Sequence, residues 1–270
     1  MASSSSSAVS ANALRIGRNS ANRVIFGHGL GDSPRGWADV CAYWSRELPN
    51  VQFVLPAAPM RPVTLNGGAE MPAWYDLPAH SELAKYSSRL EMNVNGIEDA
   101  LAMYSEHVVD PESTVFAGFS QGAAVALYTG MCAAIVSKAK GKKSVPRGIL
   151  ALSGYLPAAK ALMAVAESLQ KDRATTPEVP LAATVAQKVC NCSHVPVLLC
   201  HGRQDEMVSY WNAEKTQIFL REEFEINAEL LSYDMGHEAC QKEVDAVAKW
   251  LHDRFPKHDE KFLDEHGARM

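Results

Sequence analysis

Six short apolar segments, separated by stretches with helical patterns, constrain the fold of this chain more than any other feature. Most of them are apolar throughout, which is typical of strands covered on both faces of a sheet. In the intervening stretches apolar residues recur at helical spacing, as Ile97, Leu101 and Tyr104 do. The pattern predicts the α/β class, with a mostly parallel central sheet and helices on both faces. The six expected strands are RVIF (23–26), VQFVLP (51–56), STVFAG (113–118), GILALSG (148–154), VPVLLCHG (195–202) and INAELLSY (226–233).

The chain has 270 residues and neither an internal repeat nor a shift in composition, which indicates one domain over residues 21–255. Residues 1–20 are rich in Ser and Ala and are predicted to be disordered, although the last residues before Arg23 are expected to join the domain. Residues 158–193 are expected to be a surface insertion or a lid, with the insertion favoured. Residues 256–270 are expected to form a charged C-terminal tail.

Charge and cysteine usage limit the function classes. The formal charge of -5 gives no general attraction to nucleic acid or anionic membranes, and no apolar run approaches the roughly 20 residues of a membrane-spanning helix. The six cysteines lie mostly in apolar segments, which favours a reducing compartment and a cytoplasmic location. A zinc site at Cys190, Cys192 and His194 lacks an evident fourth ligand, so surface thiols are expected there and no metal is assigned.

The strongest chemical signal is FAGFSQGAAVALYTG, residues 116–130. Gly118, Ser120 and Gly122 form G-x-S-x-G between a predicted strand and a predicted helix, which is the context of a nucleophile elbow. The glycines are needed because side chains at these two positions would collide with the neighbouring strand and helix. The motif therefore predicts Ser120 as a nucleophile at the end of the sheet.

A serine nucleophile needs a base, and that base needs an acid, which follow in the order Ser, Asp or Glu, His in this type of fold. Asp205 and His237 each follow a predicted strand and are the best-placed acid and base. Glu206 and Asp234 are competing acids. The histidines that compete with His237 either follow no strand, lie near the C-terminus, or begin a turn that favours a hydrogen bond to local backbone: His28, His80, His107, His201, His252, His258 and His266.

The glycine-rich turn in RVIFGHGLGDSPRGW (23–37) permits two interpretations. A dinucleotide loop starting at Gly27 requires a third glycine at position 32, where the chain has Asp32, and an acid after the second strand, which is missing. The alternative is that the turn presents a backbone N–H to an oxyanion. The N–H groups of Leu30 and of Gln121, which follows the nucleophile, are the expected donors.

Six motifs in the same order resemble the acyl-protein thioesterase / lysophospholipase / carboxylesterase family over about residues 23–252. They are HGLGD (28–32), LPAAPMRPVTLNGGAEMPAWYD (55–76), GFSQGA (118–123), SGYLP (153–157), HGRQDEMV (201–208) and MGHEA (235–239). The resemblance implies an α/β-hydrolase that cleaves acyl esters and thioesters without a cofactor. It aligns Ser120, Asp205 and His237 with the triad of the family, and the N–H groups of Leu30 and Gln121 with its oxyanion hole.

The resemblance also implies that Leu65, Met71 and Trp74 line an acyl site, whereas the residues alone favour burial of this apolar loop. The segment between SGYLP and HGRQD is longer than usual for the family, so the rim of the acyl site is expected to differ. Position 2 is Ala2, so neither N-terminal myristoylation nor the near-terminal palmitoylated cysteine of some members carries over from the family. Any contact with a membrane surface is then expected to be transient.

The sequence thus predicts a serine hydrolase, with long-chain acyl thioesters on protein cysteines as the first substrate class. Lysophospholipids and short-chain esters are the nearest alternatives, so the expected partner is an acylated protein or a lysophospholipid. A catalytically silent ligand-binding homologue is the alternative from another class. Oligomeric state is left open.

Overall fold

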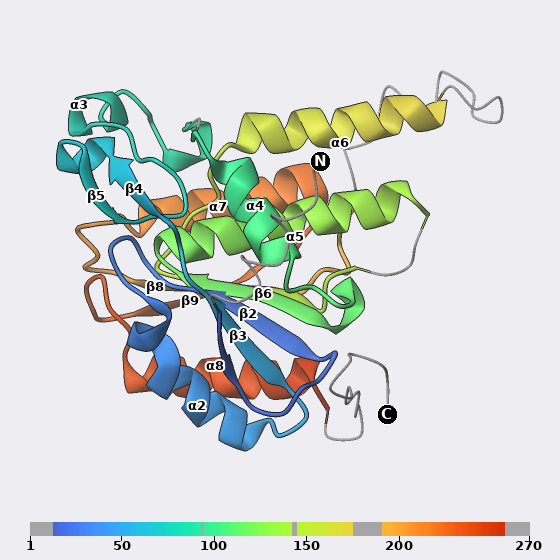
Figure 1. The fold of residues 1–270 in the computed structure, drawn as a ribbon. Coiled ribbons are helices and arrows are strands. Elements are labelled where there is room, and N and C mark those ends of the chain that lie inside the picture. Colours follow the sequence, from blue (N-terminus) through green and yellow to red (C-terminus); the bar gives the residue numbers. More distant parts are fainter. Residues whose placement is uncertain (1–12, 93, 142–144, 175–190, 257–270) are drawn as a thin grey trace, which may run out of the picture.

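A seven-stranded sheet forms the centre of the computed structural model, which describes residues 13–92, 94–141, 145–174 and 191–256 (Figure 1). The strand order is β1-β3-β2-β6-β7-β8-β9, and only β1 runs antiparallel to its neighbour. The mostly parallel sheet and the six expected strands are therefore confirmed. The strands are β1 (Ala13–Ile16), β2 (Arg23–Gly27), β3 (Gln52–Pro56), β6 (Thr114–Phe119), β7 (Gly148–Leu152), β8 (Val197–Gly202) and β9 (Glu229–Tyr233).

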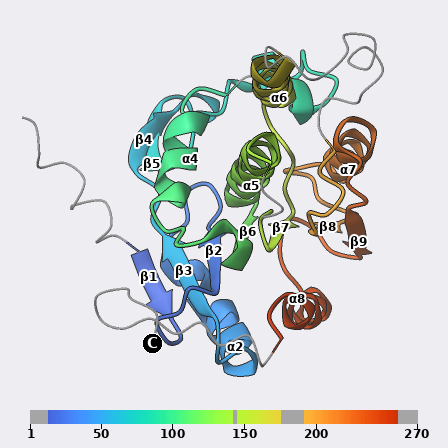
Figure 2. The same cartoon turned by 90° about the vertical axis from the view of Figure 1, so that its right-hand side faces the viewer.

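Helices cover both faces of the sheet, as Figure 2 shows in a view turned by 90°. One face carries α2 (Ala38–Glu47) and α8 (Gln241–Arg254). The opposite face carries α4 (Ile97–Ser105), α5 (Gln121–Ala139) and α7 (Trp211–Phe224), with α6 (Ala159–Ala174) packed on α5. Short helices in the connections are η1 (Pro34–Trp37), η2 (Thr64–Asn66), α3 (His80–Leu83), η3 (Arg89–Glu91) and η4 (Pro111–Ser113).

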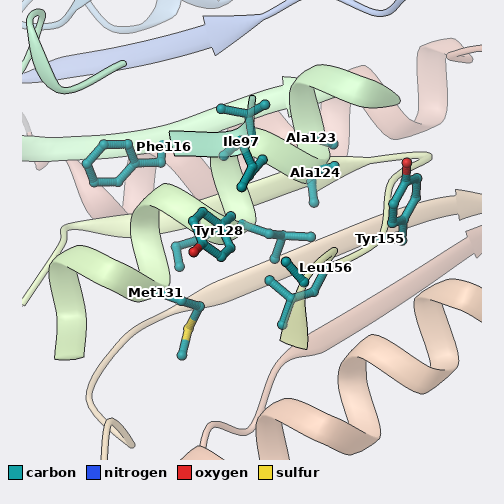
Figure 3. Packing of buried hydrophobic residues seen from close by; sticks show 14 of the residues in the cluster. Ile97, Phe116, Ala123, Ala124, Tyr128, Met131, Tyr155 and Leu156 are labelled. Atoms are coloured by element: carbon teal, nitrogen blue, oxygen red, sulfur yellow. The ribbon is translucent and has the colours of Figure 1, made fainter. Parts of the chain in front are cut away.

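Two hydrophobic clusters, one on each face, hold these layers together. The larger cluster surrounds α5, and Figure 3 shows part of it, where Tyr128 and Met131 of α5 pack near Leu156. Ile97 and Tyr104 of α4 are fully buried in it, as the helical spacing predicted. The smaller cluster lies between the sheet and helices α2 and α8. Burial on both faces explains why the central strands are apolar at nearly every position.

Helix α5 corrects one expectation about apolar segments. By length and composition its 19 residues could cross a membrane, with a mean hydropathy of 1.4. However, 72% of this segment is buried inside the fold, where it contacts β6, β7, α4 and α6. A helix covered on most sides by the same chain needs an apolar surface all round. We therefore interpret α5 as the core helix of the domain.

Strand β1 corrects the prediction that residues 1–20 are disordered. Residues 13–16 pair antiparallel with β3, in a register that joins Ala13 to Pro56 and Ile16 to Phe53. The segment ALRI is a half-exposed edge strand, so it lacks the continuous apolar run by which the other strands were recognised. Its pairing covers the outer edge of β3, and residues 1–12 lie outside the described part of the chain.

The apolar segment 55–76, predicted as a loop, contains a β-hairpin of β4 (Met60–Val63) and β5 (Ala69–Pro72). Gly67 and Gly68 have φ values of 68° and 83° at its tip, a left-handed conformation that glycine adopts without steric cost. The strands have four residues each and contain Pro62 and Pro72, so the sequence showed neither a strand-length run nor clean alternation.

The described residues test only part of what the sequence predicted for the segment 158–193, the cysteines near it and the C-terminal tail. In the segment 158–193, residues 159–174 form α6, in which Leu162 and Ala166 are buried, while residues 175–190 lie outside the described residues. The expected surface thiols are wrong for Cys192, which is buried, and Cys190 lies outside the description. The C-terminal tail beyond Pro256 also lies outside the described chain.

Candidate active site

The carboxyl ends of the parallel strands bring the predicted site residues to one edge of the sheet. Ser120 follows β6 and precedes α5 with φ 54° and ψ -117°, a strained conformation for a residue with a side chain. A Cβ atom added at Gly118 would lie 2.4 Å from the carbonyl carbon of Gly122. One added at Gly122 would lie 2.2 Å from the carbonyl oxygen of Gly27. The local geometry is that of a nucleophile elbow.

Ser120, His237 and Asp205 form a continuous hydrogen-bonded chain. The Oγ atom of Ser120 lies 2.8 Å from Nε2 of His237, and Nδ1 of His237 lies 2.7 Å from Oδ2 of Asp205. Because the ionised carboxylate accepts hydrogen bonds, Nδ1 carries the proton and Nε2 is free to accept one from the serine. The structure thus joins the three residues that the sequence singled out. Ser120 and His237 are 117 residues apart in the chain, and Asp205 and His237 are 32 residues apart.

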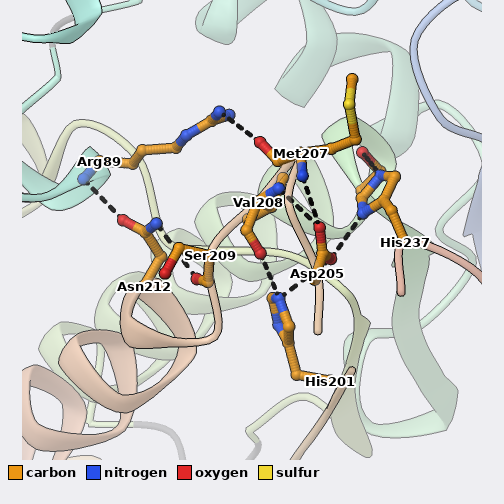
Figure 4. A network of polar contacts seen from close by, with 9 residues as sticks. Arg89, His201, Asp205, Met207, Val208, Ser209, Asn212 and His237 are labelled. Carbon is orange, nitrogen blue, oxygen red and sulfur yellow. Dashed lines mark hydrogen bonds and ion pairs between the residues drawn. The ribbon is translucent and has the colours of Figure 1, made fainter. Parts of the chain in front are cut away.

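Asp205 is held by four donors that favour its charged form (Figure 4). Its Oδ1 accepts hydrogen bonds from the N–H groups of Met207 and Val208 at 2.9 and 2.7 Å. Burial alone would raise the pKa of this carboxyl, but the hydrogen bonds from His201, His237 and Val208 outweigh burial and hold the pKa well below its usual range. Asp205 is therefore ionised at neutral pH and fixes the orientation of the His237 ring.

The competing acids and bases have other positions. Glu206 is exposed, and Asp234 accepts a hydrogen bond from Gln204 at the surface. His107 is buried, and desolvation lowers its pKa to about 4, with the charges of Arg15 and Arg23 adding to the shift.

His201 contacts Asp205, a role that the sequence did not predict for it. Its ring donates from Nε2 to the carbonyl oxygen of Val208 at 2.7 Å, which is the local backbone bond expected of it. The same nitrogen lies 3.2 Å from Oδ2 of Asp205, the oxygen that also accepts the hydrogen bond from Nδ1 of His237. The side chain of His201 is fully buried, so both contacts are shielded from water. The motif HGRQDEMV places this histidine four residues before the acid, and that spacing is the signal that was available.

The loop that carries Leu30 presents three consecutive peptide units, each fixed by at least one hydrogen bond. The carbonyl of His28 accepts from Nε1 of Trp74, the carbonyl of Gly29 accepts from Nδ1 of His28, and the N–H of Gly31 donates to Pro72, all at 2.8 Å. In a planar trans peptide the C=O and N–H point in opposite directions. The N–H of Leu30 is therefore turned away from the His28 ring.

The His28 ring is itself fixed. Its Nε2 accepts the N–H of Ala58 at 3.1 Å, so the proton resides on Nδ1. Burial lowers the pKa of His28, which keeps the ring neutral, although the bond to Gly29 opposes this effect.

The two expected oxyanion donors adjoin the nucleophile. A Cβ added at Gly29 would lie 3.5 Å from Cβ of Ser120, so the Leu30 loop lies directly against the elbow. Gln121 is the first residue of α5, so its N–H has no acceptor within the helix. Neither N–H donates to another of the described residues. Two unengaged backbone donors beside a serine hydroxyl are the arrangement that stabilises an oxyanion.

The three residues expected at an acyl site separate into two groups. Leu65 and Met71 are half-buried at the rim of the larger cluster, together with Leu30, and the sulfur of Met71 lies beside Gly31. Trp74 has no exposed surface, so its ring offers no face to a ligand in this structure. The indole lies instead between His28 and Tyr104, with centroid distances of 5.2 and 5.3 Å. The expectation from the residues alone, burial, is correct for Trp74.

The protein is an α/β-hydrolase with a serine nucleophile. This class is defined by the order of the strands in the sheet, the strained serine after β6 and the hydrogen-bonded Ser-His-Asp chain. The model of the phospholipase/carboxylesterase family matches residues 14–178 and 173–254, so the chain belongs to that family. It is accordingly a hydrolase of ester or thioester bonds.

Similar proteins point to one branch of this family. Acyl-protein thioesterase 1 of Neurospora crassa is 33% identical over 244 residues, covering 87% of each chain. Acyl-protein thioesterase 1 homolog 1 of Dictyostelium discoideum is 33% identical over 87% of this chain and 91% of its own. The crystal structure of Zea mays acyl-protein thioesterase 2 has a TM-score of 0.64 at 28% identity and covers 90% of this chain and 99% of its own.

Proposed function

We propose that this protein hydrolyses long-chain acyl thioesters on protein cysteines, through an acyl-enzyme formed on Ser120. The observation that carries the proposal is the unbroken chain Ser120–His237–Asp205 beside two unengaged backbone N–H groups. The similarity to acyl-protein thioesterases over most of the chain supports the choice of substrate class.

In the acylation step His237 accepts the proton of Ser120 at Nε2 while Oγ attacks the acyl carbonyl. The negative charge that develops on the carbonyl oxygen is stabilised by the N–H groups of Leu30 and Gln121. Asp205 remains ionised and stabilises the imidazolium that forms, because four donors hold its charge in place.

Collapse of the tetrahedral intermediate expels the leaving group, which His237 protonates where needed. A thiolate leaves readily without a proton, so thioesters demand less of this general acid than oxyesters do. In the deacylation step His237 removes a proton from water, the hydroxide adds to the acyl carbonyl, and the acid is released as Ser120 recovers its proton.

Covalent labelling tests the hydrolase mechanism. We expect a serine-directed fluorophosphonate to label the wild-type protein and not Ser120→Ala. The same substitution should reduce ester hydrolysis to the background rate. An unlabelled but folded wild type, or a Ser120→Ala variant that retains activity, contradicts the proposal and leaves a ligand-binding homologue as the better description.

Matched substrates test the specificity. Thioesters, lysophospholipids and short oxyesters are compared across acyl lengths by kcat/KM. The proposal expects long-chain acyl thioesters to be the best substrates. Preference for lysophospholipids or for short oxyesters assigns the alternative activity, and equal, low rates on all long chains remove the thioesterase assignment while the hydrolase mechanism stands.

We extend the proposal to a cytoplasmic location and to acylated proteins met at a membrane surface only transiently. In support, all five cysteines among the described residues are free, and burial raises the pKa of the Cys132 thiol to about 12, so it is unreactive. Fractionation of cells expressing the full chain, with detection in the soluble fraction, is the measurement that checks the location.

A further inference from the structure

The two backbone donors of the candidate oxyanion hole lie far apart in the chain, one in the Leu30 loop and one at Gln121. One short segment forms hydrogen bonds with the Leu30 loop and with the side chain of Gln121. Residues 72–75 begin at the last residue of β5 and lie between the Leu30 loop and the start of α5. Towards the Leu30 loop, the carbonyl of Pro72 accepts the N–H of Gly31, and the indole N–H of Trp74 donates to His28. These bonds orient two peptide units on either side of the Leu30 N–H.

Towards the elbow, the same segment is bound by the side chain of Gln121. Its Oε1 accepts the backbone N–H of Trp74 at 2.9 Å, and its Nε2 donates to the carbonyl of Tyr75 at 2.8 Å. Gln121 is 2% exposed and Trp74 is 0% exposed, so water does not compete for these bonds. A carboxamide that uses both ends on one extended segment fixes the direction and the distance of that segment.

We propose that the indole of Trp74 and the carboxamide of Gln121 are positioning residues that set the spacing of the two oxyanion donors. Residues 72–75, which we term the clamp segment, transmit this spacing because they bond to both loops. The inference rests on the proposed function, since it assigns a purpose to the N–H groups of Leu30 and Gln121. It gives Trp74 a role through its nitrogen atom rather than through contact with an acyl chain.

The expected effect is specific to the transition state. Oxyanion donors act at 2.7–3.1 Å from the developing charge, so a small displacement weakens them most when the charge is largest. Loss of a clamp bond should therefore lower kcat and leave KM nearly unchanged. A merely structural bond, by contrast, contributes to stability and leaves kcat in place.

The chain offers matched controls for both side chains. Trp44 is also fully buried, and its indole donates to the carbonyl of Val244 at 2.9 Å on the other face of the sheet. Gln217 of α7 donates from Nε2 to the carbonyl of Ala228 at 2.8 Å. The experiment compares Trp74→Phe with Trp44→Phe, and Gln121→Met with Gln217→Met, by kcat, KM and thermal melting.

We expect Trp74→Phe and Gln121→Met each to lower kcat by about tenfold or more, with KM within twofold. Inhibition by a long-chain trifluoromethyl ketone, which forms an oxyanion on the serine, should weaken by the same factor. The two control variants should melt earlier and keep kcat within twofold. Gln121→Met decides the matter if Trp74→Phe does not fold.

The clamp is overturned if the clamp variants keep kcat within twofold, or if each member of a pair loses the same amount. Ser120→Ala separates this failure from that of the proposed function. An inactive Ser120→Ala with fully active clamp variants removes only the clamp, whereas an active Ser120→Ala removes the mechanism on which it rests.

Discussion

The two halves of the candidate site are held by different kinds of contact. The loop that carries Asp205 is closed by its own residues: Asp205 accepts from Val208 three positions on, and His201 donates to the same Val208 seven positions on. The oxyanion side is held by a segment from elsewhere, since Trp74 bonds to His28 and to Gln121 across 46 and 47 residues.

The acid side of the site is specified by a short sequence motif, whereas the oxyanion side depends on contacts with a distant segment. A loop closed locally needs only a short motif, and HGRQDEMV contains the donor, the acid and the acceptor together. A loop held from a distance depends on the packing of the whole domain, because the clamp segment that holds it lies at the end of the β4–β5 hairpin, more than 40 residues along the chain. We therefore expect the oxyanion side to be the more sensitive of the two to changes outside its own motif.

The largest effect is expected on the acid side, from Asp205→Asn. The amide would turn a donor towards Nδ1 of His237 or favour the wrong tautomer of the ring, so kcat should fall about 10⁴-fold with the fold intact. Steady-state kinetics and circular dichroism check this.

Asp234→Asn, at the exposed competing acid, is the control for Asp205→Asn and should stay within about twofold of the wild type. A large loss there with a mild loss at Asp205 reverses the assignment of the acid.

His201 tests whether the acid side depends on more than backbone N–H groups. His201→Phe leaves the carbonyl of Val208 and one contact of Asp205 without a donor, and should lower kcat by about ten- to a hundredfold. His201→Gln retains an N–H group of similar reach and should lose less. Activity of His201→Phe within twofold of the wild type would mean that Met207 and Val208 hold Asp205 by themselves.

A double variant that combines His201→Phe with Trp74→Phe tests whether the two halves of the site are held independently. The two residues support different loops and share no hydrogen-bond partner, so their effects on the activation free energy should add to within about 0.5 kcal/mol. Strong coupling in this double-mutant cycle, measured from kcat/KM, contradicts the division of the site into two independently held halves.

Glu243 of α8 gives the smallest expected effect on catalysis and a clear effect on stability. Its carboxyl is fully buried and neither oxygen has a hydrogen-bond partner among the described residues, and burial raises its pKa to about 8. The folded state therefore binds this proton more tightly than the unfolded state, and stability declines as pH rises towards 8.

Replacement of Glu243 by Gln removes this dependence. Relative to the wild type, Glu243→Gln should gain on the order of 2–4 kcal/mol in unfolding free energy between pH 5 and pH 8.5. Urea denaturation at both pH values measures it, and Glu222→Gln at an exposed position is the control. A difference that does not change with pH shows that the pKa of this carboxyl is not raised in the folded state.

Much of the fold and of the candidate site was accessible from the sequence. Five of the six expected strands are buried along nearly their whole length, and burial on both faces makes such strands apolar. Ser120, Asp205 and His237 were singled out because each follows a strand, and parallel strands bring their carboxyl ends to one edge.

Other features were not accessible. Strand β1 is half-exposed and short, and the β4–β5 hairpin is interrupted by prolines, so neither shows a periodic signal. The contact between His201 and Asp205 depends on the turn taken between them, which spacing alone does not determine. The inward position of Trp74 depends on the partners that its indole meets in the folded state.

The sequence by itself determined where six of the strands lie along the chain and that a tight turn carries Ser120, because each of these features depends on residues close together in the chain. Only the tertiary structure decided how the N–H groups of Leu30 and Gln121 are held, since the Leu30 loop and the Gln121 side chain form hydrogen bonds with Pro72, Trp74 and Tyr75. These bonds join segments that are far apart in the chain, and no local pattern of residues records them.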